Sequence, residues 1–172
     1  EKTSLLFFIP LLINTGTSAT PPKPVTPVKK PINVLFLLAD DQRADALGAS
    51  GNTYVKTPNI DKLASSGVRF SNSYIMGGHH GAICAPSRAM LMSGKSLFHV
   101  YDRLEGVTTM PMYFNSYGYD TFGTGKWHNG PATFETSFKK GKYVFFGGMA
   151  DHFNIPCRDL GPDGKLTTAV YK

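Results

Sequence analysis

The sequence lacks the features on which several classes of protein depend. Its two cysteines are too few for a disulfide-rich scaffold or for a zinc site with four cysteine ligands. No apolar run reaches the roughly 20 residues of a membrane-spanning helix, so no membrane span is expected. The net charge of +6 is not gathered into a basic stripe, so nucleic acid is not an expected partner. Hydrophobic residues make up 41% of the chain, which is enough for a core and excludes wholesale disorder.

The first residues have the pattern of an export signal. A short apolar run at 5–13 follows Lys2, and small residues at 17–19 offer a cleavage site. Because the first residue is Glu1, we expect residues 1–19 to be a truncated signal peptide. The protein is therefore expected to be exported, either to the periplasm or out of the cell.

A linker and a folded part are expected to follow. Residues 20–31 contain five prolines, which predicts an extended linker before a folded part at 32–172. In that part, strand-length apolar segments alternate with segments of helical periodicity. This pattern predicts an α/β fold with a largely parallel, mixed central sheet flanked by helices. The expected strands are 32–39, 68–74 and 119–124; the expected helices are 58–66, with Thr57 as N-cap, 86–92 and 109–117. Beyond residue 130 the pattern fades into loops rich in glycine and aromatic residues.

The first expected strand ends in Asp40 and Asp41. Ligands of open α/β sheets gather at the carboxyl ends of the strands, where adjacent carboxylates can bind a divalent cation. The same two residues can also form a turn or a helix cap, and both interpretations stay open from this pair alone.

A cysteine stands at the start of another expected helix. Cys84 is followed by Ala-Pro-Ser-Arg, and a helix N-terminus offers N–H groups and a positive dipole end that suit an anion. Arg88, one turn later, can bind the same anion through several donors. These residues predict an oxyanion site beside a sulfur. That sulfur could be a phosphatase-like thiolate, a redox thiol or the precursor of another group.

The segment Cys-Ala-Pro-Ser-Arg at 84–88 resembles the signature of the type I sulfatases. Three further segments resemble the same family: the strand with paired aspartates at 33–41, the helix and strand at 57–70, and the Gly-rich segment ending in Lys-Trp-His at 118–128. Thr124 departs from the small or apolar residue usual in the last of these. Four segments in the family's order imply the N-terminal part of a sulfatase fold of the alkaline phosphatase superfamily.

The resemblance implies a modified nucleophile and a metal. In this family a maturation enzyme oxidises the cysteine to formylglycine, an aldehyde whose hydrate attacks the sulfur of a sulfate ester. Cys84 would be that residue, and a formylglycine-generating enzyme would be a partner. Asp40 and Asp41 would bind Ca²⁺, or Mg²⁺, next to the converted Cys84.

The resemblance also assigns basic residues to the site. Arg88 would orient the diol and offset its charge, and Lys126 would bind the diol or the sulfate. His128 would help to remove the diol proton as the sulfate leaves. Taken alone, Lys126 and His128 could be a surface lysine and a capping histidine. His79 and His80 could contact the substrate or could be ordinary loop residues.

Cys157 is the only other cysteine. In an exported protein, a disulfide between Cys84 and Cys157 is an alternative to two thiols. The resemblance instead implies that Cys157 is a free or buried thiol.

Part of the family's pattern is not found at 131–172. The resemblance implies a second metal pair, a later histidine that protonates the leaving alcohol and a later lysine on the sulfate. We therefore expect residues 32–172 to be an incomplete catalytic domain that is inactive alone and binds metal weakly.

The leading hypothesis is an exported sulfuric ester hydrolase that acts on a sulfated carbohydrate, because an exported enzyme meets polysaccharides. One alternative is a phosphonate monoester or phosphodiester hydrolase of the same superfamily. Another is a secreted, non-catalytic domain that binds sulfated glycans and keeps Cys84 unmodified. A cysteine-dependent phosphatase ranks last, since its spacing from cysteine to arginine is usually longer.

Overall fold

The computed structural model describes residues 32–79, 81 and 83–168. The expected signal peptide and linker, residues 1–31, lie outside the described residues. The chain divides into two compact units, one that ends at Tyr74 and one that begins at Ile75. Among the described residues, no helix is both long and apolar enough to cross a bilayer.

The described residues of the first unit, 32–74, form a short 3₁₀ helix, η1 (Gly48–Ser50), and an α-helix, α1 (Pro58–Ser66). The carboxylate of Asp61 joins them, since its Oδ1 accepts the N–H of Ala49 at 2.7 Å and the hydroxyl of Thr57 at 2.9 Å. The expected helix is confirmed from Pro58 to the residue before Gly67. Thr57 holds the N-cap position, but its hydroxyl serves Asp61 and the N–H of Gly48 instead of capping the helix.

Two expected strands, at 32–39 and 68–74, are wrong. Neither segment is a strand, and every strand in the described part of the chain lies in the second unit. The apolar side chains of the first segment are largely exposed, with Leu35 at 82% and Leu37 at 70%. A strand persists only when its backbone groups pair with a neighbour, so hydrophobicity without a partner strand is not enough.

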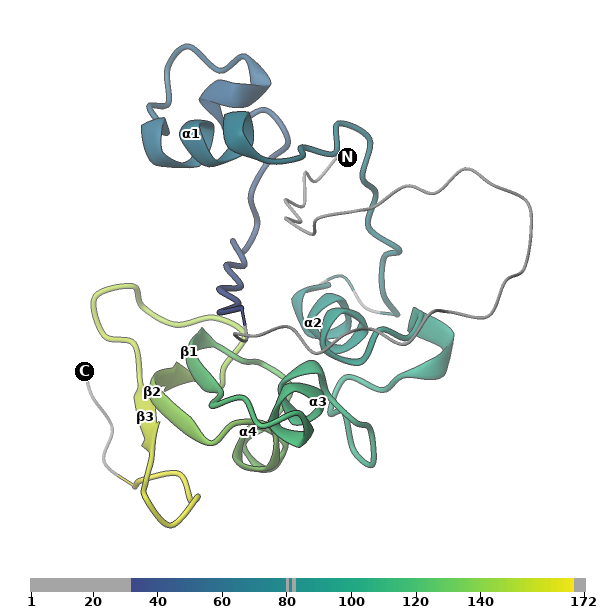
Figure 1. The fold of residues 1–172 in the computed structure, drawn as a ribbon, viewed down its shortest axis with the longest axis vertical. Coiled ribbons are helices and arrows are strands. Elements are labelled where there is room, and N and C mark those ends of the chain that lie inside the picture. Colours follow the sequence, from purple (N-terminus) through teal and green to yellow (C-terminus); the bar gives the residue numbers. More distant parts are fainter. Residues whose placement is uncertain (1–31, 80, 82, 169–172) are drawn as a thin grey trace. The chain divides into compact units, whose positions relative to one another are not determined.

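The second unit is a mixed α/β structure (Figure 1). Its elements in order are α2 (Cys84–Ser93), η2 (Leu97–His99), α3 (Met110–Ser116), β1 (Phe122–Lys126), α4 (Pro131–Ser137), β2 (Lys140–Phe145) and β3 (Cys157–Leu160). The strands form one sheet in the order β1-β2-β3. β1 and β2 run parallel with α4 as their connection, while β2 and β3 run antiparallel. The expected α/β class is confirmed, with a small sheet that is only partly parallel.

The sheet packs through an aromatic cluster. Phe134 of α4 is 1% exposed and lies 5.5 Å from Trp127 and 4.8 Å from Phe138, measured between ring centroids. Its ring sits over Gly123 and Gly141, which face each other on β1 and β2. A Cβ at either glycine would come within 2.8 Å of the ring, so the two glycines make room for Phe134.

Helices near this sheet follow their sequence signals. α2 ends at Gly94 in the left-handed conformation (φ 67°), and α3 begins after Thr109, so both expected helices are confirmed within two residues. The expected strand at 119–124 is confirmed in part, as β1 from Phe122. The expectation of loops beyond residue 130 is wrong, because α4, β2 and β3 all lie there.

Candidate active site

The candidate site begins at the first turn of α2. Cys84 is the first residue of the helix and is half-buried. Ile83, the N-cap residue, supplies no side-chain cap, and the N–H of Ser87 closes the first turn on the Ile83 carbonyl at 3.0 Å. This helix start presents backbone N–H groups and the positive end of the helix dipole beside the cysteine sulfur.

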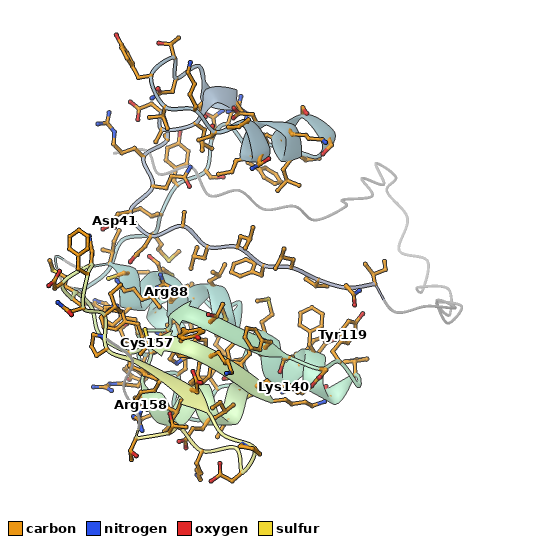
Figure 2. All side chains as sticks on the ribbon, turned by 90° about the vertical axis from the view of Figure 1, so that its left-hand side faces the viewer. Asp41, Arg88, Tyr119, Lys140, Cys157 and Arg158 are labelled. Carbon is orange, nitrogen blue, oxygen red and sulfur yellow. The ribbon has the colours of Figure 1, made fainter. Side chains whose placement is uncertain are left out.

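Arg88 connects this helix to the end of β1. Its side chain is buried, and Nη1 donates to the backbone oxygen of Lys126 at 2.7 Å. Figure 2 labels Arg88 on α2. A guanidinium has five donors, so Arg88 can hold this carbonyl and an anion at the same time.

Lys126 and His128 meet at a single glycine. Lys126 ends β1, and its Nζ donates to the carbonyl oxygen of Gly148 at 2.8 Å. His128 has a positive φ of 65°, and its ring lies against the same glycine. A Cβ on Gly148 would be 3.1 Å from Nε2 of His128, which is closer than side chains normally pack.

Asn129 is a site residue that the sequence analysis missed. It is fully buried, and its Nδ2 donates to the carbonyl of Ala85 at 3.0 Å and to the carbonyl of Asp102 at 2.6 Å. The first of these bonds holds the turn that follows Cys84 against the segment carrying His128. The only signal in the sequence is a polar residue directly after Lys-Trp-His, and nothing local shows that it is buried.

The structure thus brings together the elements that carry four of the predicted site residues. Arg88 contacts the backbone of Lys126, and Lys126 and His128 share Gly148. Asn129 ties the start of α2, next to Cys84, to the same turn. The start of α2 and the turn after β1, which carry a thiol, a guanidinium, an ammonium and an imidazole, are thus joined by these bonds.

Asp40 and Asp41 belong to the first unit and are both exposed. Asp41 has a positive φ of 54°, a backbone conformation that aspartate tolerates better than most residues. Carboxylate oxygens are the donors that a hard cation takes, so the pair fits Ca²⁺ or Mg²⁺ in ligand type. Two carboxylates supply only part of a coordination shell, and the described residues contain no group of three or more His, Cys, Asp or Glu suited to a metal.

Of the remaining predicted residues, His80 alone lies outside the part of the chain that the structure describes, and His79 is exposed. Cys157 lies on β3 (Figure 2) and is a free thiol, as is Cys84, so the alternative of a disulfide between them is not supported. Burial, together with the negative charge of Asp159, raises the pKa of the Cys157 thiol, which makes it a poor nucleophile at neutral pH.

Known proteins with similar sequences are sulfatases. The family profile described as Sulfatase matches residues 32–165. The chain is 32% identical over 127 residues to the N-acetylglucosamine-6-O-sulfatase of Bacteroides thetaiotaomicron, which covers 67% of this chain and 21% of that protein. It is also 32% identical over 147 residues to the iduronate 2-sulfatase of Homo sapiens, covering 78% of this chain and 26% of that protein. Arylsulfatase A of Homo sapiens is 32% identical over 149 residues, which cover 77% of this chain and 28% of that protein.

The chain therefore spans between 21% and 28% of the length of these three relatives. The matched family profile includes the start of α2, with Cys84 and Arg88, and the turn after β1, with Lys126 and His128. By the extent of this match, the chain belongs to the sulfatase family.

Proposed function

We propose that this chain carries the nucleophile side of the active site of an exported sulfuric ester hydrolase. The observation that supports the proposal is the bond from Arg88 to the backbone of Lys126, because it joins the cysteine-bearing helix to the basic turn. The proposed substrates are sulfate esters of carbohydrates. The names of two relatives, which specify N-acetylglucosamine and iduronate, support that class.

The proposed nucleophile is formylglycine made from Cys84 by a maturation enzyme. Once formed, its hydrate would supply an oxygen nucleophile for the sulfur of the ester. The position of Cys84 at the start of α2 supports this role, since the helix dipole favours negative charge developing beside it. Cys157, with its raised pKa, has no role in the proposal.

The basic residues would bind and orient the sulfate. The bond from Arg88 to the Lys126 carbonyl fixes the direction of the guanidinium, which supports a role in orienting the sulfate. The ammonium of Lys126 would offset the charge of the sulfate, and the imidazole of His128 would accept and return a proton at the hydroxyl of the nucleophile. The contacts of both side chains with Gly148 fix their positions.

Asp40 and Asp41 are the proposed carboxylate ligands of a divalent cation, because carboxylate oxygens are the donors that Ca²⁺ and Mg²⁺ prefer. A calorimetric titration of the protein with calcium measures the affinity of this pair for the cation. Asp41→Asn is expected to weaken binding at least tenfold. Asp45→Asn is the matched control, because Asp45 is also exposed but is paired with Arg43 at 2.7 Å. Equal affinities for the two variants would remove Asp41 from the metal site.

The first test of the proposed function is the mass of residue 84. The protein is coexpressed with a formylglycine-generating enzyme and digested with trypsin, which releases Cys84 in peptide 70–88 and Cys157 in peptide 143–158. Conversion lowers the mass of the first peptide by about 18 Da, as an aldehyde oxygen replaces the thiol and one hydrogen. The second peptide is the internal control and keeps its thiol. If Cys84 stays unmodified while a standard sulfatase in the same cells is converted, the assignment of Cys84 as the formylglycine precursor is wrong.

The second test compares reaction classes. The complete gene product, with residue 84 converted, is expected to hydrolyse 4-nitrophenyl sulfate faster than 4-nitrophenyl phosphate or a phenyl phosphonate ester. A preference for the phosphorus esters would favour the alternative of a phosphonate monoester or phosphodiester hydrolase. Retention on immobilised heparin without turnover would favour the alternative of a glycan-binding domain.

A further inference from the structure

A loop of the second unit lies against the proposed catalytic residues. It joins β2 to β3 and covers residues 146–156, visible as the long yellow-green connection in Figure 1. Its third residue, Gly148, accepts the hydrogen bond of Lys126 and contacts the ring of His128. The loop is therefore continuous with the candidate site.

The topology of the sheet explains this placement. β1 and β2 are parallel, so their carboxyl ends lie at the same edge of the sheet. The pairing continues past β1, because the N–H of Trp127 donates to the carbonyl of Phe145 at 2.8 Å. The chain that leaves β2 must then start beside the turn that carries His128. Ligands of parallel sheets bind outside this kind of edge.

Asp151 gives the middle of the loop a defined shape. Its Oδ1 accepts the N–H of Phe153 at 3.0 Å, its Oδ2 accepts the side-chain amide of Asn154 at 3.1 Å, and its carbonyl accepts the N–H of Asn154 at 3.0 Å. These bonds to the ionised carboxylate hold the pKa of Asp151 below its usual range. The turn is thus a built feature of the loop.

Two large apolar side chains, one before this turn and one within it, are almost fully exposed. Met149 is 96% exposed and Phe153 is 93% exposed. Single exposed apolar residues are ordinary. Here two of them share one short loop whose base is bonded to a proposed catalytic lysine, and aromatic and thioether groups are the side chains that line ligand sites.

We infer that residues 147–154 form a substrate-contacting loop, in which Met149 and Phe153 determine specificity for the alcohol part of the sulfate ester. The inference rests on the proposed function. Gly148 fixes the loop to Lys126 and His128, so the apolar residues that follow it contact the part of the substrate beyond the sulfate. The ligand class is a carbohydrate ring, whose C–H faces pack on an aromatic side chain. Contacts with this unreactive part of the substrate can favour one substrate over another, because they position its sulfate for the reaction.

The test compares substrates that share the sulfate and differ in the alcohol. The complete, converted protein is assayed with 4-nitrophenyl sulfate and with N-acetylglucosamine 6-sulfate, as the parent and as Met149→Ala, Phe153→Ala and the double variant. We expect the ratio of kcat/KM between sugar and aryl ester to change at least fivefold in the double variant, mostly through KM. Phe153→Tyr keeps the aromatic face and is expected to retain the parent ratio.

Tyr117→Ala is the matched control, since Tyr117 is an aromatic residue at the end of α3 that is 68% exposed. Its ratio should match that of the parent. A double variant whose ratio stays within twofold of an active parent would overturn the inference alone. A converted parent that hydrolyses no sulfate ester would overturn the proposed function, and the inference with it.

Discussion

Arg88 donates from Nη1 to the backbone oxygen of Lys126 across 2.7 Å, and the two residues lie 38 positions apart in the sequence. One buried guanidinium therefore holds the first turns of α2 to the end of β1. In a sulfatase-family chain, these two elements carry the cysteine and the basic turn. The same residue thus has a structural bond, in addition to its proposed role in binding sulfate.

The first prediction separates the structural role of Arg88 from its charge. Arg88→Met keeps the aliphatic volume but leaves the Lys126 carbonyl without this donor. We expect a loss of about 2 kcal/mol in the free energy of unfolding, the usual value of a buried hydrogen bond to a charged group. Urea denaturation followed by far-UV circular dichroism measures the loss.

Arg43→Met is the control for this prediction. Arg43 is 80% exposed in its side chain and pairs with Asp45 at the surface, so its loss should leave the unfolding midpoint close to that of the parent. Equal midpoints for the two variants would show that the bond from Arg88 to Lys126 does not stabilise the fold.

The second prediction concerns Asn129. Asn129→Asp replaces a donor by a carboxylate that faces the carbonyl oxygens of Ala85 and Asp102. We expect it to destabilise the protein by about 2 kcal/mol or more at pH 7, because two buried acceptors lose their donor beside a buried charge. The loss should shrink as the pH is lowered, starting above the usual titration range of an aspartate, because burial raises the pKa of the new acid and its protonated form can donate one bond again.

Asn72→Asp is the matched change at an exposed position, where the amide has only a long contact of 3.5 Å with Ser71. Its stability should stay near that of the parent. If both variants unfold at the same urea concentration, Asn129 does not hold the start of α2.

Helix boundaries could be predicted from the sequence because their signals are local. Pro58 and Gly67 mark α1, and Gly94 ends α2 in a conformation that glycine adopts most easily. Strands could not be predicted in the same way, since the apolar run at 32–39 has the composition of a buried strand but no described partner. β1 and β2 pair at Gly123 and Gly141, over which the ring of Phe134 packs, and composition gives no signal for this contact.

In the candidate site, too, local signals could be predicted from the sequence and long-range contacts could not. Cys84, Arg88, Lys126 and His128 could be named from motifs, and the structure joins their elements. Asn129 could not be identified, because its importance lies in being fully buried between two carbonyl oxygens from separate segments. Long-range contacts of this kind are fixed by the packed fold, not by neighbouring residues.

The third prediction tests the packing of the Phe134 ring against Gly141. Gly141→Ala places a Cβ 2.6 Å from the Phe134 ring, and the packed sheet leaves little room to relax. We expect a loss of about 1–3 kcal/mol. Phe134→Leu in the same chain should make Gly141→Ala less costly, which a double-mutant cycle in urea would measure as coupling.

Gly81→Ala controls for the general effect of replacing a glycine, because a Cβ there meets no atom of the described residues within 4 Å. Its midpoint should not fall. Strict additivity of Phe134→Leu and Gly141→Ala would contradict the contact between them.

The fourth prediction is a pH dependence that arises at Glu135. Its carboxylate accepts the N–H of Leu166 at 2.9 Å and lies 3.3 Å from Nζ of Lys165, thereby joining α4 to the segment after β3. The backbone bond from Leu166, with a smaller effect of Lys165, holds the pKa of Glu135 below its ordinary value of 4.5. A lowered pKa in the folded state adds stability above pH 4.5, and this stability is lost as the pH falls through the folded pKa.

Glu135→Gln should therefore unfold more easily than the parent by about 1 kcal/mol at pH 7. The difference should shrink as the pH falls below 4.5, as measured by urea denaturation at a series of pH values. Lys165→Met, which removes only the exposed partner, should cost less than about 0.5 kcal/mol. A difference between Glu135→Gln and the parent that does not shrink as the pH falls below 4.5 would mean that Glu135 does not ionise more readily in the folded chain.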